Sequence, residues 1–406
     1  MFVGWDWANE THDVSILDEE GTLIDRWALR HDEEGVEAAL ARLASHGAPA
    51  SLPVAIETAS GLVVDRLLEA GHPVVPIHPN AFNAARPRWG ASRAKSDPGD
   101  SFKLADYLRT DGHRLRRLEP VDAATAELQS LSRLRSDHVG AKVAATNQLR
   151  ATLQRHWPGA AAIFGRLDSE IALAFLEDYP TPEAAARLGE GRLAMFCRRH
   201  SYSGRRAPAE LLERLRAAPS PIQAIGPETL TEMVRVQVRL LRALLSSIAD
   251  LDRALGAALL EHAKAPLLAP MPRIGEVNLA QVIAEVGPLL ARTSDAQETC
   301  ALVGATPVTK ESGKARAVNF RWAVNTEARR ALSIFADNSR HASPWAAQLY
   351  ADARARGKRH PHAVRILMRA WLRVMWRCWH SNTAYDPAIH GAERRFAERE
   401  IQTSAA

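Results

Sequence analysis

The chain has 406 residues, enough for two or three domains, and 46% of them are hydrophobic. This composition is typical of a globular protein and excludes a disordered chain. The formal net charge of +5 is too small to identify a partner. We expect a cytoplasmic location and no membrane partner, because no apolar run is long enough to span a bilayer. The three cysteines are far apart, which argues against a disulfide framework or a zinc site.

The first eighty residues predict three strands followed by alternating helices and strands. Apolar alternation and turn-like breaks indicate the strands, and helical spacing of leucine and valine indicates the helices. We expect strands at 2–8, 13–17, 22–29, 54–56 and 74–77, and helices at 33–44 and 62–70. This order is that of an RNase-H-like α/β domain, in which Asp6 and Glu57 would lie on adjacent strands.

Four carboxylates interrupt these patterns. Asp6 breaks the apolar run 2–7, and Glu57 ends the run 52–56. Asp97 and Asp100 share one face of a helix expected at 97–108, because residues three apart are neighbours. Acidic residues in a first turn are also common simply because they offset the helix dipole. A strand-end carboxylate is costly unless it is paired or binds a cation, so we expect the four to form one Mg²⁺ site.

Two long helical patterns follow a basic segment. Residues 80–96 are predicted to be a loop, with Arg93 and Lys95 near its end. The helical patterns cover 123–157 and 230–255 and are expected to pair, either antiparallel within the chain or between chains. Residues 159–225 between them look like a helical insert.

Two basic regions near the C-terminus are candidate nucleic-acid contacts. Residues 303–316 look like a loop in which Ser312 precedes a glycine and has Lys310, Lys314 and Arg316 close by, although serine–glycine pairs are usually plain turns. A helix at 362–380 carries arginines at every fourth position: Arg365, Arg369, Arg373 and Arg377. Such a stripe suits a phosphate backbone, and a solvated helix face explains it equally well.

Several motifs occur in an order that carries a resemblance to a known family. They are Gly4-Trp5-Asp6, Ile56-Glu57-Thr58, Lys95-Ser96-Asp97-Pro98-Gly99-Asp100, Pro272-Arg273-Ile274-Gly275 and Glu311-Ser312-Gly313-Lys314. In this order the chain resembles the DEDD-type transposases of the insertion-sequence-110 family, which are recombinases guided by a bridge RNA. It departs from the family pattern after Asp6, at 7–9, and after Ser312, at 318–322.

The resemblance implies a RuvC-like nuclease domain (1–120), a coiled-coil and helical region (121–265), a mainly α-helical transposase domain (266–390) and a tail (391–406). It implies Asp6, Glu57, Asp97 and Asp100 as Mg²⁺ ligands and Ser312 as the nucleophile that becomes linked to DNA. The implied partners are target and donor DNA, a bridge RNA and further copies of the chain in a homodimer or homotetramer. We expect alanine at Asp97 or Asp100 to abolish cleavage without affecting folding.

Two alternatives remain open from the sequence. A RuvC-like endonuclease could resolve DNA junctions with a metal-activated water, which would leave Ser312 an ordinary loop residue. A nucleic-acid-binding protein with an inactive site would cleave nothing. Only the serine mechanism yields a covalent protein–DNA adduct.

Overall fold

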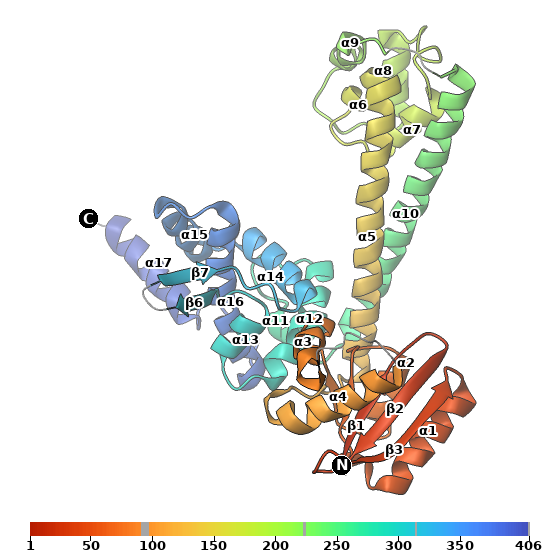
Figure 1. Cartoon of the computed structure of the whole chain (residues 1–406). Helices are drawn as coiled ribbons and strands as arrows, with labels where there is room; N and C mark the ends of the chain where they lie inside the picture. Colours follow the sequence, from red (N-terminus) through yellow and green to blue (C-terminus); the bar gives the residue numbers. More distant parts are fainter. Residues whose placement is uncertain (91–96, 222–224, 313–314, 405–406) are drawn as a thin grey trace. The chain divides into compact units, whose positions relative to one another are not determined.

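The chain divides into two compact units, residues 1–121 and 122–406 (Figure 1). The computed structural model describes residues 1–90, 97–221, 225–312 and 315–404. Of the predicted nucleic-acid contacts, Arg93, Lys95 and Lys314 lie outside the described residues. For Asp97, Lys310 and Arg316 the backbone is described and the side chain is not. No helix within these ranges is both long and apolar enough to cross a membrane.

The first unit contains a five-stranded mixed sheet with the strand order β3-β2-β1-β4-β5. β1, β2 and β3 form an antiparallel meander, and β4 and β5 run parallel to β1. The predicted adjacency of the strands that carry Asp6 and Glu57 is therefore confirmed. The strands are β1 (Phe2–Asp6), β2 (Thr11–Leu17), β3 (Leu23–Arg30), β4 (Val54–Ile56) and β5 (Val74–Pro76).

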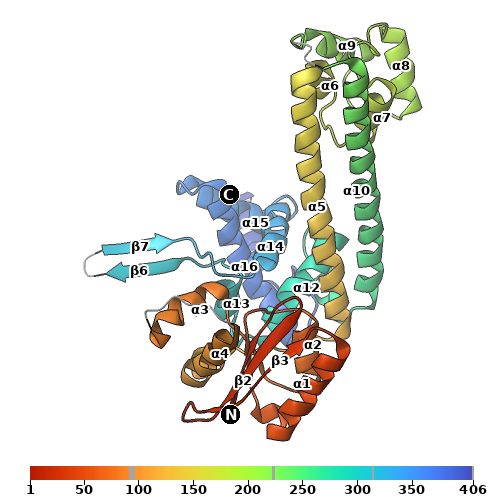
Figure 2. The same ribbon diagram turned by 45° about the vertical axis from the view of Figure 1, so that its right-hand side comes forward.

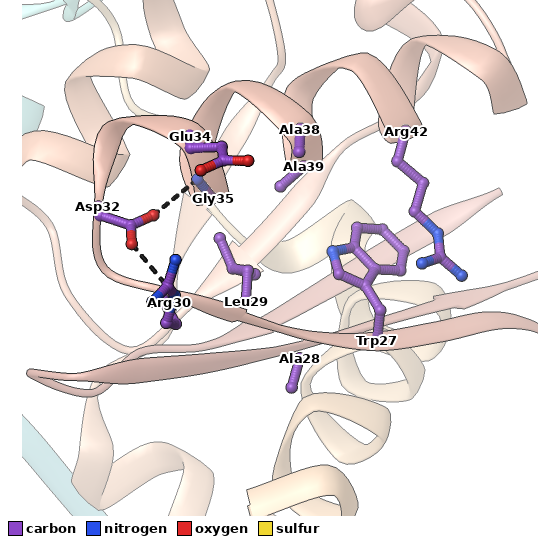
Figure 3. Close-up of a pocket in the computed structure, with 10 residues that line it drawn as sticks. All are labelled: Trp27, Ala28, Leu29, Arg30, Asp32, Glu34, Gly35, Ala38, Ala39 and Arg42. Carbon is purple, nitrogen blue, oxygen red and sulfur yellow. Dashed lines mark hydrogen bonds and ion pairs between the residues drawn. The ribbon is translucent and has the colours of Figure 1, made fainter.

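Helices cover both faces of this sheet. α1 (Glu33–His46) and α2 (Leu62–Glu69) bury their apolar side chains against one face, where Trp5 is fully buried. On the other face, Leu104 and Leu108 of α4 (Asp97–Asp111) pack with Ala55 of β4. Figure 3 shows the start of α1, where Asp32 accepts a hydrogen bond of 2.8 Å from the Gly35 amide. This cap satisfies one amide that the first turn leaves unpaired.

The segment predicted as a loop at 80–96 is helical over most of its described length. It forms α3 (Pro79–Ala85) and the 3₁₀ helix η2 (Arg86–Trp89), so the loop prediction was wrong there. Pro79 occupies the first helical position, where its missing N–H costs nothing, and the His78 side chain accepts from the Asn80 amide. Arg86 is consequently held on an ordered turn.

In the second unit, two long helices pack along each other within the chain. α5 (Ala123–His156) and α10 (Pro227–Glu261) run antiparallel, as Figures 1 and 2 both show. An ion pair between Arg135 and Asp252 and a hydrogen bond of 3.1 Å from Gln237 to Thr152 connect them. Of the two arrangements that the sequence left open, the antiparallel pair within the chain is observed.

The insert between the long helices is a small helical cap with its own core. Phe175, which is fully buried, makes ring contacts with Trp157, Phe164 and Phe196. The helices of this cap are α6 (Pro158–Ile163), α7 (Glu170–Asp178), α8 (Glu190–Arg199) and α9 (Pro208–Ala217).

A second core lies in the C-terminal part of this unit, around α12 and Trp371 of α16. The helices are α11 (Ala265–Leu268), α12 (Glu276–Arg292), α13 (Ala296–Leu302), α14 (Thr326–Ser339), α15 (Pro344–Ala355), α16 (His360–Ser381) and α17 (Gly391–Ser404). α17 occupies most of the predicted tail, and Ser343 donates a hydrogen bond of 2.9 Å to its Glu393.

Residues 308–312 and 315–319 form the two strands of a β-hairpin where a loop was predicted. β6 (Val308–Ser312) pairs with β7 (Ala315–Asn319) in antiparallel register. Val308, Thr309 and Val318 are β-branched, which favours extended backbone, and the glycine after Ser312 is typical of a hairpin turn. The loop prediction weighted the small residues and missed this pattern.

Candidate active site

Helix α4 lies directly on strand β1 because residue 4 is glycine. A methyl group at Gly4 would lie 2.0 Å from the Ser101 carbonyl oxygen and 2.4 Å from the Ala105 amide nitrogen. No side chain larger than hydrogen fits between these two backbones. The Ser101 hydroxyl is also 2.8 Å from the Ser15 hydroxyl of β2. The first turn of α4, with Asp100, is thereby fixed on this face of the sheet.

Asp6 and Glu57 lie side by side at the carboxyl ends of their strands. Trp5 pairs with Ile56 in the parallel ladder, so the next residues of β1 and β4 are neighbours. Side chains two residues apart on a strand share a face. Asp6 therefore shares the face of Gly4, and Glu57 follows directly after β4, whose Ala55 packs on α4. Both carboxylates are half-buried.

Arg86 connects these carboxylates. Its two Nη atoms donate hydrogen bonds of 2.9 and 2.7 Å to Asp100, and Lys103 Nζ donates a third of 2.9 Å. The pKa of Arg86 is raised, first by the bond to Asp100 and further by the charges of Asp100, Glu57 and Asp6. Arg86 thus binds Asp100 directly, and the charges of Asp6 and Glu57 act on the same guanidinium group.

Asp100 is buried, with 2% of its surface exposed. Burial by itself would raise the pKa of its carboxyl group, but the hydrogen bonds from Arg86 and Lys103 outweigh that effect and the pKa is lowered. Asp100 is therefore ionised and paired. The expectation that alanine at Asp100 leaves the fold unaffected rests on a surface-facing side chain, and that premise is wrong because Asp100 is buried. The substitution would also leave Arg86 without its main hydrogen-bond partner.

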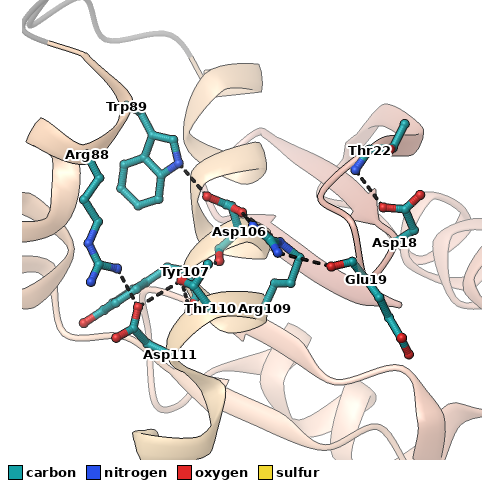
Figure 4. A network of polar contacts seen from close by, with 10 residues as sticks. All are labelled: Asp18, Glu19, Thr22, Arg88, Trp89, Asp106, Tyr107, Arg109, Thr110 and Asp111. Atoms are coloured by element: carbon teal, nitrogen blue, oxygen red, sulfur yellow. Dashed lines mark hydrogen bonds and ion pairs between the residues drawn. The ribbon is translucent and has the colours of Figure 1, made fainter.

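A network of polar contacts fastens the η2 turn to α4 (Figure 4). Trp89 Nε1 donates a hydrogen bond of 2.8 Å to Asp106 of α4, and Arg88 forms an ion pair with Asp111 at the end of the same helix. Arg109 donates to the Glu19 carbonyl at 3.2 Å and also pairs with Asp106. The turn that carries Arg86 is thus fastened to α4, and α4 is fastened to the β2–β3 connection.

Sequence reasoning missed one further carboxylate on this face. Asp13 of β2 lies directly opposite Asp6 in the antiparallel register and is half-buried. Directly opposite residues point to the same side of a sheet. The available signal was its position between His12 and Val14, both buried, in an alternating strand. Asp6 and Asp13 therefore share the face on which α4, with Asp100, packs, and Glu57 follows the end of the neighbouring strand β4.

The donor chemistry of this face suits a hard divalent cation, since all four groups offer carboxylate oxygens. Their arrangement is not that of a loaded site: within the described ranges, no three Asp, Glu, His or Cys side chains are placed to hold a metal ion. The Asp97 side chain lies outside that search, and the oxygens of Asp100 contact Arg86 and Lys103. Metal binding at Asp100 would require Arg86 to move.

Ser312 occupies a different setting, in the second unit. It is the last residue of β6, pairs with Ala315 and is exposed. Figure 2 shows that the hairpin projects from the helices of its own unit. This position makes the hydroxyl accessible to a large substrate. Its role as nucleophile stays a prediction.

The predicted arginine stripe lies along α16, whose other face buries Leu367, Met368, Trp371 and Met375. Arg373 and Arg377 are exposed, whereas Arg365 and Arg369 are half-buried. In the part of the chain that the structure describes, no carboxylate forms an ion pair with any of the four. Their positive charge is consequently available to a ligand, and nucleic-acid binding stays a prediction.

Comparisons with known proteins match most of the chain. A family model for DEDD transposases of the IS110 type, described as "Transposase", matches residues 3–158. A second, described as "Transposase IS116/IS110/IS902 family", matches residues 265–351. The first match spans Asp6, Glu57, Asp97 and Asp100, and the second spans Ser312. Both parts of the predicted chemistry thus lie in regions that the family shares.

Three relatives extend this similarity. The chain is 34% identical over 403 residues to the "Mini-circle putative transposase for IS117" of Streptomyces coelicolor, a match that covers 95% of each protein. It is 35% identical over 202 residues to the "Putative transposase y4uE" of Sinorhizobium fredii, over 49% of this chain and 56% of the relative. It is 25% identical over 401 residues to the "Insertion element IS900 uncharacterized 42 kDa protein" of Mycobacterium paratuberculosis, over 96% and 98%.

Proposed function

Because the chain belongs to the IS110 family of insertion-sequence transposases, we propose that it is an RNA-guided DNA recombinase that works through a serine-linked intermediate. Its N-terminal unit acts as an RuvC-like nuclease domain. The observation that carries this proposal is that Arg86, which binds Asp100 of α4, also lies within the electrostatic influence of Asp6 and Glu57 at the ends of β1 and β4.

In this proposal Asp6, Glu57, Asp97 and Asp100 hold Mg²⁺. When bound, the ion would offset negative charge on the scissile phosphate and on the leaving oxygen. Asp6 and Glu57 would hold the ion from neighbouring strand ends, and Asp100 would be available to it only when its carboxylate is not paired with Arg86. The freed guanidinium, fixed by the contacts around η2, remains beside the site and can donate to a phosphate oxygen of the substrate.

Ser312 performs the strand exchange. Its Oγ attacks phosphorus, the Oγ–P bond forms as the bond to the leaving oxygen breaks, and the hydroxyl proton is transferred so that the leaving oxygen departs as a hydroxyl group. One phosphate ester replaces another, so the energy of the phosphodiester is retained. A second DNA strand end can then reverse the step at the serine and complete recombination.

The partners follow from the same family resemblance. We propose that a bridge RNA selects target and donor DNA and that the chain acts as a homodimer or homotetramer. The side chains proposed to contact nucleic acid are Arg93, Lys95, Lys310, Lys314, Arg316, Arg365, Arg369 and Arg373. The carboxylate cluster would equally serve a junction-resolving endonuclease that uses a metal-activated water, and that is the second candidate function.

A covalent adduct separates these functions. The protein is expressed together with the DNA that flanks its gene, co-purified RNA is sequenced, and the complex is given end-labelled flanking DNA with Mg²⁺. The serine mechanism predicts a labelled band that survives denaturing electrophoresis and disappears in Ser312→Ala and Asp97→Ala. Cleavage without an adduct would support the endonuclease, and neither cleavage nor an adduct would support an inactive binding protein.

A further inference from the structure

A cavity of about 450 Å³ lies beside the end of the β6–β7 hairpin, between α14 and the start of α16. Phe320, Arg329, His360 and Arg365 are among the residues that line it. The guanidinium carbons of Arg329 and Arg365 lie 4.4 and 5.0 Å from the centre of the Phe320 ring. Two positive charges therefore share one aromatic ring at the cavity wall.

Arg329 and Arg365 differ in their hydrogen-bond partners. Arg329 is a structural residue: it donates to the backbone carbonyls of Val303 and Arg321, and a methyl group at Gly304 would overlap its Nη2 at 2.1 Å. Arg365 is half-buried, yet among the described residues no acceptor lies within hydrogen-bond distance of its guanidinium group. A partly desolvated guanidinium without an acceptor is costly, so an anionic ligand would stabilise it.

The surroundings of Arg365 add positive charge. Asp337, which also lines the cavity, is paired with Arg340 at 2.8 Å. Burial lowers the pKa of Arg365 itself. Burial also lowers the pKa of His362, and the charges of Arg365, Lys358 and Arg369 lower it further. The cavity is therefore a place where an anion is favoured over a cation.

An exposed aromatic side chain stands next to it. Trp322 is 81% exposed, and its ring meets that of Phe320 edge-on at 4.8 Å between centroids. A tryptophan so exposed gains little from packing in the free protein, whereas a large flat ring is a good platform for an unpaired base. The Phe320 ring thus contacts both Arg365, the candidate anion ligand, and Trp322, the candidate stacking surface.

We propose that this cavity binds one phosphate group of a single-stranded nucleic acid, with Arg365 as the charged ligand and Trp322 as the surface on which the adjacent base stacks. The inference rests on the proposed function only for the class of ligand. It places an unpaired strand next to the hairpin that carries Ser312, within the same unit of the chain.

The test measures binding of the full-length protein to labelled oligothymidylate and oligouridylate of twelve residues by fluorescence anisotropy over a range of salt concentrations. We expect Arg365→Gln to weaken binding about tenfold and to lower the slope of log affinity against log salt by roughly 0.7. Arg365→Lys should keep the slope. Trp322→Ala should weaken binding about tenfold at unchanged slope, and Trp322→Phe should retain most of the affinity.

Arg253→Gln is the matched control, because Arg253 is an exposed arginine of α10 paired with Asp250. The oligonucleotide whose binding responds to Arg365 and Trp322 identifies the strand as DNA or RNA. If Arg365→Gln binds both like Arg253→Gln while wild type forms the DNA adduct, the inference is overturned and the proposed function stands. If the wild-type protein binds neither oligonucleotide but forms the DNA adduct, only the inference is overturned. If the wild-type protein binds neither oligonucleotide and forms no DNA adduct, the serine mechanism is overturned as well.

Discussion

Arg86 and Asp100 form a two-point contact in which Nη1 and Nη2 of the arginine lie 2.9 and 2.7 Å from the two carboxylate oxygens. Asp100 is almost fully buried and its other partner is Lys103. The guanidinium carries one positive charge among three carboxylates that we propose as metal ligands. It therefore stabilises the metal-free arrangement in the way a cation would, and it competes with a metal ion for Asp100.

Arg86→Gln should accordingly lower the free energy of unfolding in the absence of metal, by about 2 kcal/mol, because a buried carboxylate loses its strongest partner. The same change should increase the stabilisation by Mg²⁺, since the competitor is gone. The measurement is the thermal midpoint with and without Mg²⁺. Arg88→Gln, two residues along the same turn and paired with Asp111, is the control. An equal response to Mg²⁺ in wild type and Arg86→Gln would contradict competition at Asp100.

Gly4→Ala should destabilise the N-terminal unit severely. The added methyl group would lie 2.0 Å from a backbone carbonyl of α4, so the helix must move off the sheet. We expect a loss of about 3 kcal/mol or more, of the size seen for overpacking in a rigid core. Gly140→Ala in α5 is the opposite case, because nothing lies within 4 Å of its added methyl group, and it should be neutral or stabilise slightly. Comparable denaturation curves for Gly4→Ala and wild type would show that α4 is not in contact with β1.

Part of the carboxylate site could be predicted from the sequence, because local strand periodicity alone puts Asp6 and Glu57 at the ends of predicted strands. A strand is short, its pattern is local, and the buried run 54–56 admits few alternatives. Arg86 and Asp13 were not found. Arg86 begins a 3₁₀ turn whose proline and charged residues resemble a loop, and the importance of Asp13 comes from its register opposite Asp6.

The hairpin and the cavity show the same limit in the second unit. β6 and β7 are five residues each, and each is stabilised as a strand by hydrogen bonding to the other. Arg329 and Phe320 are nine residues apart, and Arg365 is thirty-six residues further on. Only the packing of α14 against α16 brings Arg329 and Arg365 to the Phe320 ring. No spacing rule in a single sequence predicts this contact.

The stability of the N-terminal unit should fall between pH 6.5 and pH 4 because of His12. Its ring is fully buried, and burial, with repulsion from His31, lowers its pKa from 6.5 to about 4. In that range the unfolded chain binds a proton that the folded chain does not, so stability is present above pH 6.5 and is lost as the pH falls. The loss is at most about 3 kcal/mol.

His12→Gln should flatten this dependence, because glutamine can still accept from the Ala8 amide, which His12 Nδ1 does at 3.3 Å, and does not titrate. The measurement is the denaturation midpoint at intervals from pH 7.5 to pH 4.5. His113→Gln, at an exposed position of the same unit, should retain the slope of wild type. An identical slope in His12→Gln would mean that other groups cause the acid sensitivity.

The last prediction concerns whether Ser312 and the carboxylates of one active site come from the same chain. Thirty residues of helix span about 45 Å, a length that would favour carboxylates from another chain if the two long helices extended in one direction. That reason is removed by the antiparallel packing of α5 and α10, which carries the chain out and back. The remaining argument is the position of Ser312, exposed on a projecting hairpin where a second subunit can reach it. We therefore expect a mixture of Ser312→Ala and Asp97→Ala proteins to recover DNA cleavage that neither shows alone. Each variant mixed with itself is the control, and adduct formation is the readout. If wild type forms the adduct and the mixture forms none, serine and carboxylates act within one chain.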